Sequence, residues 1–505
     1  MASSSLLFRP PRRDAADRVL LLGRLRALFG DRVTADAYER SFYRRDVVRL
    51  PLLVDRVLLT DPEAVARPVR AEEVAQTLRT AAREGVPVVP RAGATTAHFG
   101  CVPVLGGVVL DLMGLREPFL VDANALTVTV GAGTAWAELD RRLATRGMAV
   151  KSMPSSAAAS TVGGWVCTMG YGIGSLAYGR LGTQVRALEV ALADGTVRRL
   201  DGKTSPPAAW FAASEGTLGV VTAVELEVRP LRPMGHLLVA CPTGACAQTL
   251  VERLLAGGVT LYAIHLDDPG LTAAMDRLGF APEGTTPGRF AVRVDVEADA
   301  AGLAGAMDAV RAVVATVPGA DLLPADVADH EWLERFRLLR VKRGGPSVVG
   351  AEVLLPVGGL AAYLEDVERL GRACGRRFMS YAHVVGDGFA VVMTMAYADE
   401  TSPAFVLSLG VVGLLHELSA RRGGRPYGTG IWGAAYVRAH LAEPPLGEQQ
   451  RRKRVLDPRG VMNPGKGADR LRLLHPVAVR SGMGWLAAAD ALARKVRPTG
   501  KVRPI

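Results

Sequence analysis

Hydrophobic positions recur at helical and strand spacing along most of the chain. Apolar residues repeat on one face of residues 71–85, where acidic residues stand in the first turn and a glycine ends the run. The same pattern, closed by a glycine, predicts helices over 20–30 and 134–147. Short apolar or alternating runs predict strands at 86–90, 106–112 and 126–133. Helices and strands therefore alternate in the first part of the chain.

A second pattern follows after residue 184. Two apolar runs flank Asp194–Gly195, a dipeptide that favours a tight turn, so residues 185–200 are predicted to form a hairpin. Beyond Pro230 and Pro233 the strands and helices become longer, which indicates an α+β unit with its own core. The expected division is an N-terminal helical segment, a first domain, a second domain, a turn-rich closing segment and a basic tail, with boundaries at 1–50, 51–232, 233–450, 451–470 and 471–505.

Residues 152–179 interrupt this pattern. They contain no charged side chain and are rich in glycine, alanine, serine and threonine. Glycine at this density weakens both helices and strands, so we do not expect an ordinary core element. The stretch is also too polar to cross a membrane. Backbone that lies directly against a large ligand explains such a composition.

Composition and charge exclude several classes of function. The 505 residues include 61 Lys and Arg against 50 Asp and Glu, but no basic run is interleaved with aromatic residues as in a nucleic-acid-binding surface. The five cysteines are dispersed without a CxxC pair, which argues against an iron–sulfur cluster and for a reduced, cytoplasmic protein. The N-terminus lacks the apolar core of a signal peptide, and the longest apolar run, 405–415, is too short to span a bilayer.

Three glycine-rich segments precede the change at residue 233. They cover 90–96, 154–180 and 215–222. Successive backbone amides in such turns form concavities that bind anions, and threonine hydroxyls add donors. No GxGxxG follows the first strand and no GxxxxGK[ST] is present, so a Rossmann site and a P-loop are unsupported. The residues predict a large site with neutral donors, suited to a dinucleotide diphosphate.

These segments, their order and the closing run 457–466 resemble the FAD-linked oxidases of the vanillyl-alcohol-oxidase type. Within that family they are most similar to the FAD subunits of glycolate and D-lactate dehydrogenases. The resemblance implies an α+β protein, with a two-subdomain FAD-binding domain of the PCMH type and an α+β cap over the substrate.

The resemblance also implies where FAD lies. The first segment would hold its diphosphate, the second would form another wall, and the third would meet the adenine end and the flank of the flavin. The implied cofactor residues are Pro90, Arg91, Ala92, Gly93, Ala94, Thr95, Thr96, Pro154, Ser155, Thr161, Val162, Gly163, Gly164, Thr168, Gly172, Tyr178, Gly179, Glu215, Gly216, Val221 and Asn463. Some relatives attach FAD through a histidine where this chain has Thr95, so we expect non-covalent FAD. His98 is expected to be a satisfied polar residue near the pocket.

The cap should select the substrate. Relatives that oxidise D-2-hydroxy acids carry a WxxR motif, and Trp332–Arg335 resembles it, so that Arg335 could hold a carboxylate. His383 to Gly388 resembles a metal-ligand stretch without its second histidine, and Gly428 to Gly433 replaces a run that carries a catalytic histidine in relatives. We therefore expect no metal. His383, Tyr427 or Tyr436 could act as an alternative acid or base, although each of these side chains and Arg335 also suits a structural role.

The chain is thus expected to be an FAD-dependent oxidoreductase that moves a hydride between flavin N5 and an organic substrate. The substrate would be a CH–OH donor such as a 2-hydroxy acid or another alcohol. Oxygen, a quinone or a partner protein could reoxidise the flavin. The alternatives are a flavin-binding subunit without turnover and an enzyme for a larger lipophilic substrate. The basic tail, with Trp485, Leu486 and Leu492, is either a solvated helix or a peripheral membrane contact.

Overall fold

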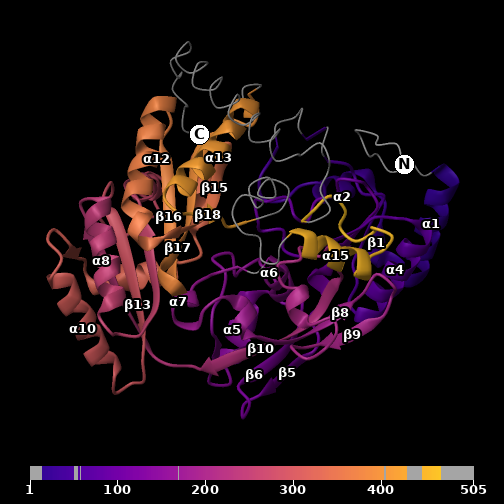
Figure 1. Cartoon of the computed structure of the whole chain (residues 1–505), viewed down its shortest axis with the longest axis horizontal. Helices are drawn as coiled ribbons and strands as arrows, with labels where there is room; N and C mark the ends of the chain where they lie inside the picture. The colour runs from indigo at the N-terminus through magenta and orange to yellow at the C-terminus, as the bar shows by residue number, and fades with distance from the viewer. Residues whose placement is uncertain are drawn as a thin grey trace.

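The chain folds into two lobes, one on each side of Figure 1. The computed structural model describes residues 14–50, 55–56, 59–168, 170–402, 405–428 and 446–467. The first lobe contains two small sheets and most residues up to Pro230, and the second lobe is built on one large sheet. The basic tail and its amphipathic segment lie outside the described residues.

A four-stranded sheet opens the first lobe. Its order is β1-β2-β4-β3, with β2, β4 and β3 parallel and β1 antiparallel at the edge. Helix α4 connects β2 to β3 and turns its apolar face to the core, and Gly85 ends the helix in a left-handed conformation. The elements are α1 (Ala15–Phe29), β1 (Val33–Thr34), α2 (Ala37–Phe42), β2 (Ala64–Ala66), α4 (Ala71–Glu84), β3 (Val88–Arg91) and β4 (Val108–Asp111).

A second sheet completes the lobe. Its order is β5-β6-β10-β8-β9, and β7 also pairs with the long strand β10. The expected hairpin is present as β8 and β9. The elements are β5 (Phe119–Asp122), β6 (Thr127–Gly131), α5 (Trp136–Ala144), β7 (Met148–Val150), α6 (Val162–Thr168), α7 (Ser175–Tyr178), β8 (Val185–Ala191), β9 (Val197–Leu200) and β10 (Val220–Pro230).

The second lobe, the cap, is an eight-stranded antiparallel sheet in the order β14-β11-β13-β12-β16-β17-β15-β18. Helices α8, α10, α12 and α13 lie together on one side of it (Figure 1). Its strands are β11 (Met234–Cys241), β12 (Leu261–Asp267), β13 (Phe290–Glu297), β14 (Asp321–Leu322), β15 (Ser347–Pro356), β16 (Phe378–Val385), β17 (Phe389–Ala398) and β18 (Arg425–Pro426). Its helices are α8 (Gly244–Ala256), α9 (Pro269–Arg277), α10 (Leu303–Ala315), α11 (Ala325–Leu333), α12 (Leu360–Cys374) and α13 (Phe405–Arg421).

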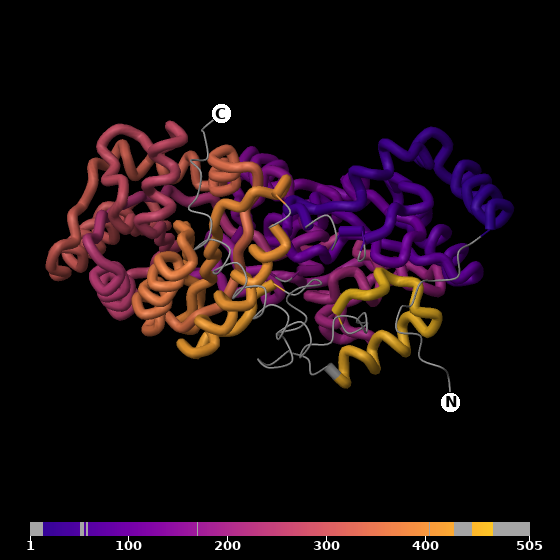
Figure 2. Tube along the Cα trace, turned by 90° about the horizontal axis from the view of Figure 1, so that it is seen from above, coloured from indigo at the N-terminus to yellow at the C-terminus, as the bar shows by residue number. Residues whose placement is uncertain are grey.

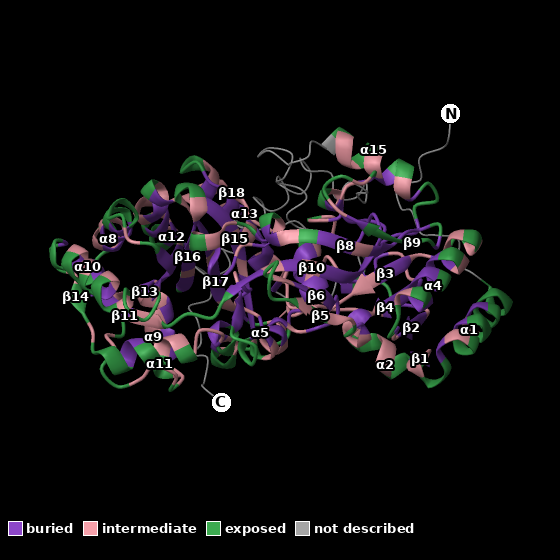
Figure 3. Ribbon diagram, turned by 90° about the horizontal axis from the view of Figure 1, so that it is seen from below, coloured by how far each residue is buried: buried purple, intermediate pink, exposed green. Residues whose placement is uncertain are grey.

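The two faces of the cap sheet differ in chemistry. Alternate residues such as Ile264, Val384 and Val353 point to the helices and join a large apolar core. Their neighbours in sequence point the other way, and this face carries His265, His383 and Glu352, which share it because directly paired residues of antiparallel strands lie on the same side. Burial extends across the strands of both lobes (Figure 3).

The closing segment returns to the first lobe. Helix α15 (Leu446–Leu456) and the turn that follows it lie beside the first lobe and away from most of the cap in Figure 2. Lys453 Nζ, which is buried, donates to the backbone oxygens of Thr217 (2.9 Å) and Met462 (2.5 Å) and to Asp457 (2.6 Å). The expected turn-rich segment is therefore present, and the hydrogen bonds of Lys453 attach it to the third glycine-rich segment.

The uncharged stretch differs from expectation in one respect. Residues 162–168 form a short helix, α6, whose Trp165 packs edge-on against Trp136 at 5.0 Å between ring centroids. This pair buries part of the stretch in the core of the second sheet. The high glycine content is compatible with a helix here because tertiary packing outweighs intrinsic propensity.

Candidate active site

One cavity lies between the two lobes, and both contribute to its walls. The three glycine-rich segments line one side, and strands β15, β16 and β17 with helix α13 line the other. Residues more than 200 positions apart thus face the same space. The site belongs to the whole chain rather than to either lobe.

The three glycine-rich segments touch one another through their glycines. A Cβ on Gly93 would lie 2.0 Å from the Ala159 carbonyl oxygen, and one on Gly164 would lie 2.9 Å from the Ala92 Cβ. Gly216 has a φ of +69°, and its Cβ would lie 2.4 Å from Pro90 Cγ. Side chains at these positions would force the segments apart, so glycine is required for the backbone cradle.

The first segment leaves its donors open. Among the described residues, none accepts a hydrogen bond from the backbone amides of residues 93–97. Thr95 instead meets the second segment, where Ser156 Oγ donates to its hydroxyl at 3.3 Å. A row of unpaired amides beside hydroxyls suits an anionic diphosphate. The cradle therefore fits the cofactor that the sequence implied.

Most of the implied cofactor residues line this cavity, and we continue to treat their roles as predictions. These residues are Pro90, Ala92, Gly93, Ala94, Thr95, Thr96, Pro154, Ser155, Thr161, Gly163, Gly164, Thr168, Glu215, Gly216 and Val221. Two cysteines, Cys101 and Cys167, line it as well, and burial raises the pKa of the Cys167 thiol to about 12. Neither thiol is therefore activated as a nucleophile at neutral pH.

Five of the implied residues lie away from the lining. The Arg91 guanidinium lies over the Tyr43 ring, 5.4 Å from its centroid. Val162 is buried in the core, and a Cβ on Gly172 would lie 2.1 Å from the Met153 carbonyl oxygen. Tyr178 donates to Glu297 at 3.0 Å, and Gly179, with a φ of +73°, ends the short helix before it. Their contacts are those of packing and turn formation.

Asn463 also lies outside the lining but links two of its segments. Its Nδ2 donates to the Gly100 oxygen at 2.8 Å and to the Glu215 oxygen at 2.6 Å. The side chain is fully buried, and its Oδ1 has no hydrogen-bond partner among the described residues. Asn463 thus links the loop after the first segment to the third segment and leaves one acceptor open to a donor that the described residues do not supply.

A histidine–carboxylate pair crosses the cavity. His98 Nε2, from the first lobe, lies 2.9 Å from Glu352 Oε2 on β15. Burial alone lowers the pKa of His98, but the hydrogen bond to Glu352 and nearby carboxylates raise it above its ordinary value. His98 is thus a satisfied polar residue at the pocket, as expected. Glu352 was missed by the sequence analysis, although a lone carboxylate in the apolar strand run 352–357 was a signal for it.

His383 faces the same cavity from β16. Its side chain is 93% buried, with a relative exposure of 7%, and neither ring nitrogen has a hydrogen-bond partner among the described residues. Burial lowers the pKa of His383 to about 4, against the opposing effects of the Glu352 charge and of the nearby Tyr171 backbone. The ring is therefore neutral at pH 7, a form that has one donor and one acceptor nitrogen.

The other two candidate catalytic residues are occupied. The Tyr427 hydroxyl lines the cavity but donates to the Tyr171 oxygen at 3.1 Å and accepts from the Tyr171 amide, and burial raises its pKa further above the ordinary value. Arg335 does not line the cavity. Its guanidinium stacks over Trp332 at 4.0 Å and over Phe336 at 4.5 Å, and it donates to the Trp332 oxygen. Tyr436 lies outside the described residues.

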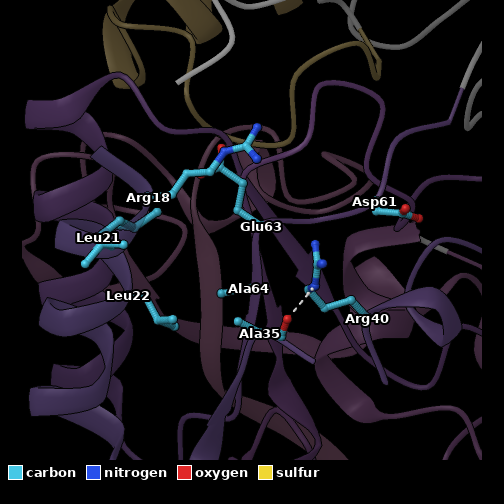
Figure 4. A pocket seen from close by; sticks show the side chains of 9 residues that line it. Arg18, Leu21, Leu22, Ala35, Arg40, Asp61, Glu63 and Ala64 are labelled. Carbon is cyan, nitrogen blue, oxygen red and sulfur yellow. Dashed lines mark hydrogen bonds between the residues drawn. The ribbon is translucent and has the colours of Figure 1, made fainter. Parts of the chain in front are cut away.

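No group of three His, Cys, Asp or Glu side chains suited to a metal ion occurs in the part of the chain that the structure describes. A second cavity, of about 630 Å³, lies between α1 and the segments around Ala35 and Ala64 (Figure 4). Arg40 donates to the Ala35 oxygen at its wall at 3.0 Å. None of the implied site residues lines this second cavity.

The described helices include none that is long and apolar enough to cross a membrane.

Comparison with protein families accounts for both lobes. A model of an FAD binding domain matches residues 62–201, and a model of the C-terminal domain of FAD linked oxidases matches residues 235–467. The two matches follow one another and together cover most of the chain, including the first two glycine-rich segments and the cap, and the third segment lies between them.

Curated relatives match over most of their length. The glycolate oxidase subunit GlcD of Bacillus subtilis is 25% identical and aligns over 80% of this chain and 88% of its own. A D-lactate dehydrogenase of Archaeoglobus fulgidus is 26% identical, with 80% and 90% covered. The mitochondrial D-2-hydroxyglutarate dehydrogenase of Rattus norvegicus is 27% identical, with 80% and 78% covered.

Solved structures confirm the expected fold. A 4-ethylphenol oxidase from Gulosibacter chungangensis superposes with a TM-score of 0.74 at 18% identity, covering 90% of this chain and 98% of its own. p-Cresol methylhydroxylase superposes with the same TM-score, 0.74, at 14% identity and with the same coverage. The architecture is therefore the expected PCMH-type FAD-binding domain with an α+β cap.

Proposed function

This chain belongs to the FAD-linked oxidases, and we propose that it oxidises a CH–OH donor at the cavity between its lobes. One observation carries the proposal: the glycine cradle and three titratable groups, His98, Glu352 and His383, line the same cavity. A cradle without such groups would only hold a cofactor. Their presence beside it provides for proton transfer at the substrate.

The cofactor implied by the family is FAD. Once bound, it would supply the oxidant, because its ring system takes up the hydride that leaves the substrate carbon. The residues that would hold it are 92–96, Gly163, Gly164 and the 215–221 segment. Thr95 stands where some relatives have the histidine that attaches FAD covalently. We therefore propose non-covalent FAD.

The residues of the cavity divide the remaining work. Oxidation of an alcohol breaks the C–H bond with its electron pair and the O–H bond as a proton, and a carbonyl forms. Glu352, held by His98, accepts the hydroxyl proton. Neutral His383 orients the same oxygen through a hydrogen bond. Tyr427 pins the cap to Tyr171 and takes no part in proton transfer.

The proposal also covers the size of the substrate, the electron acceptor and the cellular setting. The substrate is a small molecule, and the electrons pass on to oxygen, a quinone or a partner protein. None of the five cysteines, all of which the structure describes, forms a disulfide, which supports a reducing, cytoplasmic setting. A subunit that binds flavin without turnover is not favoured, because the relatives are named as oxidases and dehydrogenases.

Anaerobic titration of the purified protein tests the proposal. The protein should carry a flavin spectrum that acid denaturation releases, and an alcohol substrate should bleach it in the absence of oxygen. A protein that cannot be reconstituted with FAD, or a flavin that no CH–OH donor bleaches although dithionite does, would refute it.

A further inference from the structure

The charged groups in the cavity restrict the substrate further. A 2-hydroxy acid carries a carboxylate next to its reacting carbon, and burying that charge without a cation is costly. The chain must therefore offer a guanidinium or ammonium group for such a substrate.

The cations of the lining are already engaged. Lys342 Nζ donates to the Val47 oxygen at 2.7 Å, across the two lobes. Arg49 Nε lies 3.3 Å from Glu400 and is largely exposed. Arg335, the arginine that the WxxR motif offered for a carboxylate, stacks on Trp332 outside the lining. Among the described lining residues, each arginine or lysine thus has a partner from the protein itself.

The negative charges of the cavity point the same way. Glu352 and Glu215 both line it, and Glu352 shares its space with His383, which burial keeps neutral at pH 7. His98 balances Glu352 within their pair and leaves no excess positive charge. A second carboxylate brought beside this pair would therefore find no excess positive charge to compensate the cost of its burial.

Apart from Lys342, His416 and Tyr427, the rest of the cap wall is apolar among the described residues. Met393 pairs directly with Glu352 across β17 and β15, and Met395 pairs with Gly350. Gly350 adds no side chain to the wall, and a Cβ there would lie 2.1 Å from the Thr394 oxygen. The other apolar cap residues that line the cavity are Phe336, Leu338, Leu339, Val348, Val349, Ala351, Leu409 and Val412. Methionine side chains adapt to irregular apolar ligands.

We infer that the substrate is an uncharged alcohol whose reacting carbon bears an apolar group in place of a carboxylate. Its hydroxyl lies between Glu352 and His383, and its apolar group lies against Met393 and Met395. This inference rests on the proposed function and narrows it. It also separates this chain from relatives named for glycolate, D-lactate and D-2-hydroxyglutarate.

Matched ligand pairs test the inference in the FAD-loaded protein. Mandelate is compared with 1-phenylethane-1,2-diol, and 2-hydroxyoctanoate with octane-1,2-diol, so that each pair differs only in the carboxylate. Dissociation constants come from the visible spectrum of the oxidised flavin, or from the concentration dependence of bleaching where a ligand reduces it. Each diol should bind at least about 10-fold tighter than its acid.

Three variants locate the source of the discrimination. Glu352→Gln should tighten the binding of the acids relative to that of the diols at least about fivefold. Glu368→Gln, on the exposed side of α12, is the matched control and should change neither. Lys342→Met should not weaken the acids, because its ammonium is held by Val47.

The outcomes separate the two claims. Equal or tighter binding of the acids, a loss of acid binding in Lys342→Met, or no saturable binding of either diol would overturn the inference. Selective binding of the diols without bleaching by any alcohol would instead leave the charge selectivity standing and count against the proposed oxidation.

Discussion

Glu352 shows how the position of a residue along a β-strand decides which face of the sheet its side chain joins. It stands in a strand whose neighbours Val353 and Leu355 enter the apolar core, so its side chain must point to the opposite face. That face lines the cavity, where His98 from the other lobe meets it. A half-buried carboxylate is retained here because it is paired.

Removal of this carboxylate should slow chemistry without emptying the site. We expect Glu352→Gln to reduce the rate of anaerobic flavin reduction by the best substrate about 100-fold or more, because proton transfer loses its acceptor. Bound FAD, measured from the visible spectrum after desalting, should stay at the wild-type level. An unchanged rate would show that another group accepts the proton, and Glu368→Gln again serves as control.

His383 should make stability depend on pH. Its pKa is lowered to about 4 in the folded protein, against an ordinary value near 6.5, so between these values the unfolded chain binds the proton that the folded chain refuses. The free energy of unfolding should therefore decrease as the pH falls from about 6.5 to 4, by about 3 kcal/mol from this residue. The lowered pKa of buried His265 adds in the same direction.

Urea denaturation at several pH values measures this effect. His383→Phe removes the titrating ring, and its free energy of unfolding should depend less steeply on pH over that window. Parallel curves for the two proteins would contradict the assignment, because the loss of stability would then come from other groups.

At the scale of elements, the glycine-rich segments work as a set. Helix α6 begins with Val162 and brings Gly163 against Ala132 and Gly164 against Ala92. Each contact joins α6 to a neighbouring segment. The Lys453 and Asn463 side chains then hold the third segment by donating hydrogen bonds to its backbone oxygens. The cradle depends on these contacts between segments more than on any one turn.

A charge at the α6 glycines should empty the cradle. A Cβ on Gly163 would lie 2.6 Å from the Ala132 Cβ, so Gly163→Asp and Gly164→Asp add both bulk and negative charge where the diphosphate would lie. Each variant should lose the bound flavin after desalting. Gly305→Asp is the matched control, because a Cβ there, in exposed α10, meets nothing within 4 Å. A fully flavin-loaded Gly163→Asp protein would show that the cradle is misplaced.

At the scale of the molecule, the cavity joins the lobes. His98 and Glu352, Tyr171 and Tyr427, and Val47 and Lys342 each link one lobe to the other across it. A ligand that fills the cavity therefore contacts both lobes and stabilises their association. Stability of the whole chain should respond to the cofactor for this reason.

Removal of FAD should lower the thermal stability of both lobes together. With free FAD at 100 times its dissociation constant, the stabilisation is about 2.7 kcal/mol, enough to shift the melting temperature measurably. Calorimetry of the protein before and after FAD removal, and after FAD is added back, measures the shift. A melting temperature that does not respond to FAD would contradict a cofactor site between the lobes.

The sequence by itself determined the local elements and the kind of cofactor. Helical periodicity with terminal glycines predicted α1 and α4, and Asp194–Gly195 predicted the β8–β9 hairpin, because these signals act over a few residues. Three glycine-rich segments in order, with the family resemblance, predicted FAD. The composition of the uncharged stretch predicted that it contacts a ligand. It did not predict helix α6, whose Trp165 packs against Trp136 of α5.

Only the tertiary structure decided which side chains meet the substrate. Glu352 and His98 are 254 positions apart, and their pairing follows from how the lobes face each other, which no local pattern records. The same packing placed Arg335 on Trp332 and directed Tyr427 to the Tyr171 backbone, so two residues chosen by motif have partners other than substrate. Local patterns depend on backbone geometry within one element, whereas the active site depends on contacts between elements, and those form only when both lobes are folded.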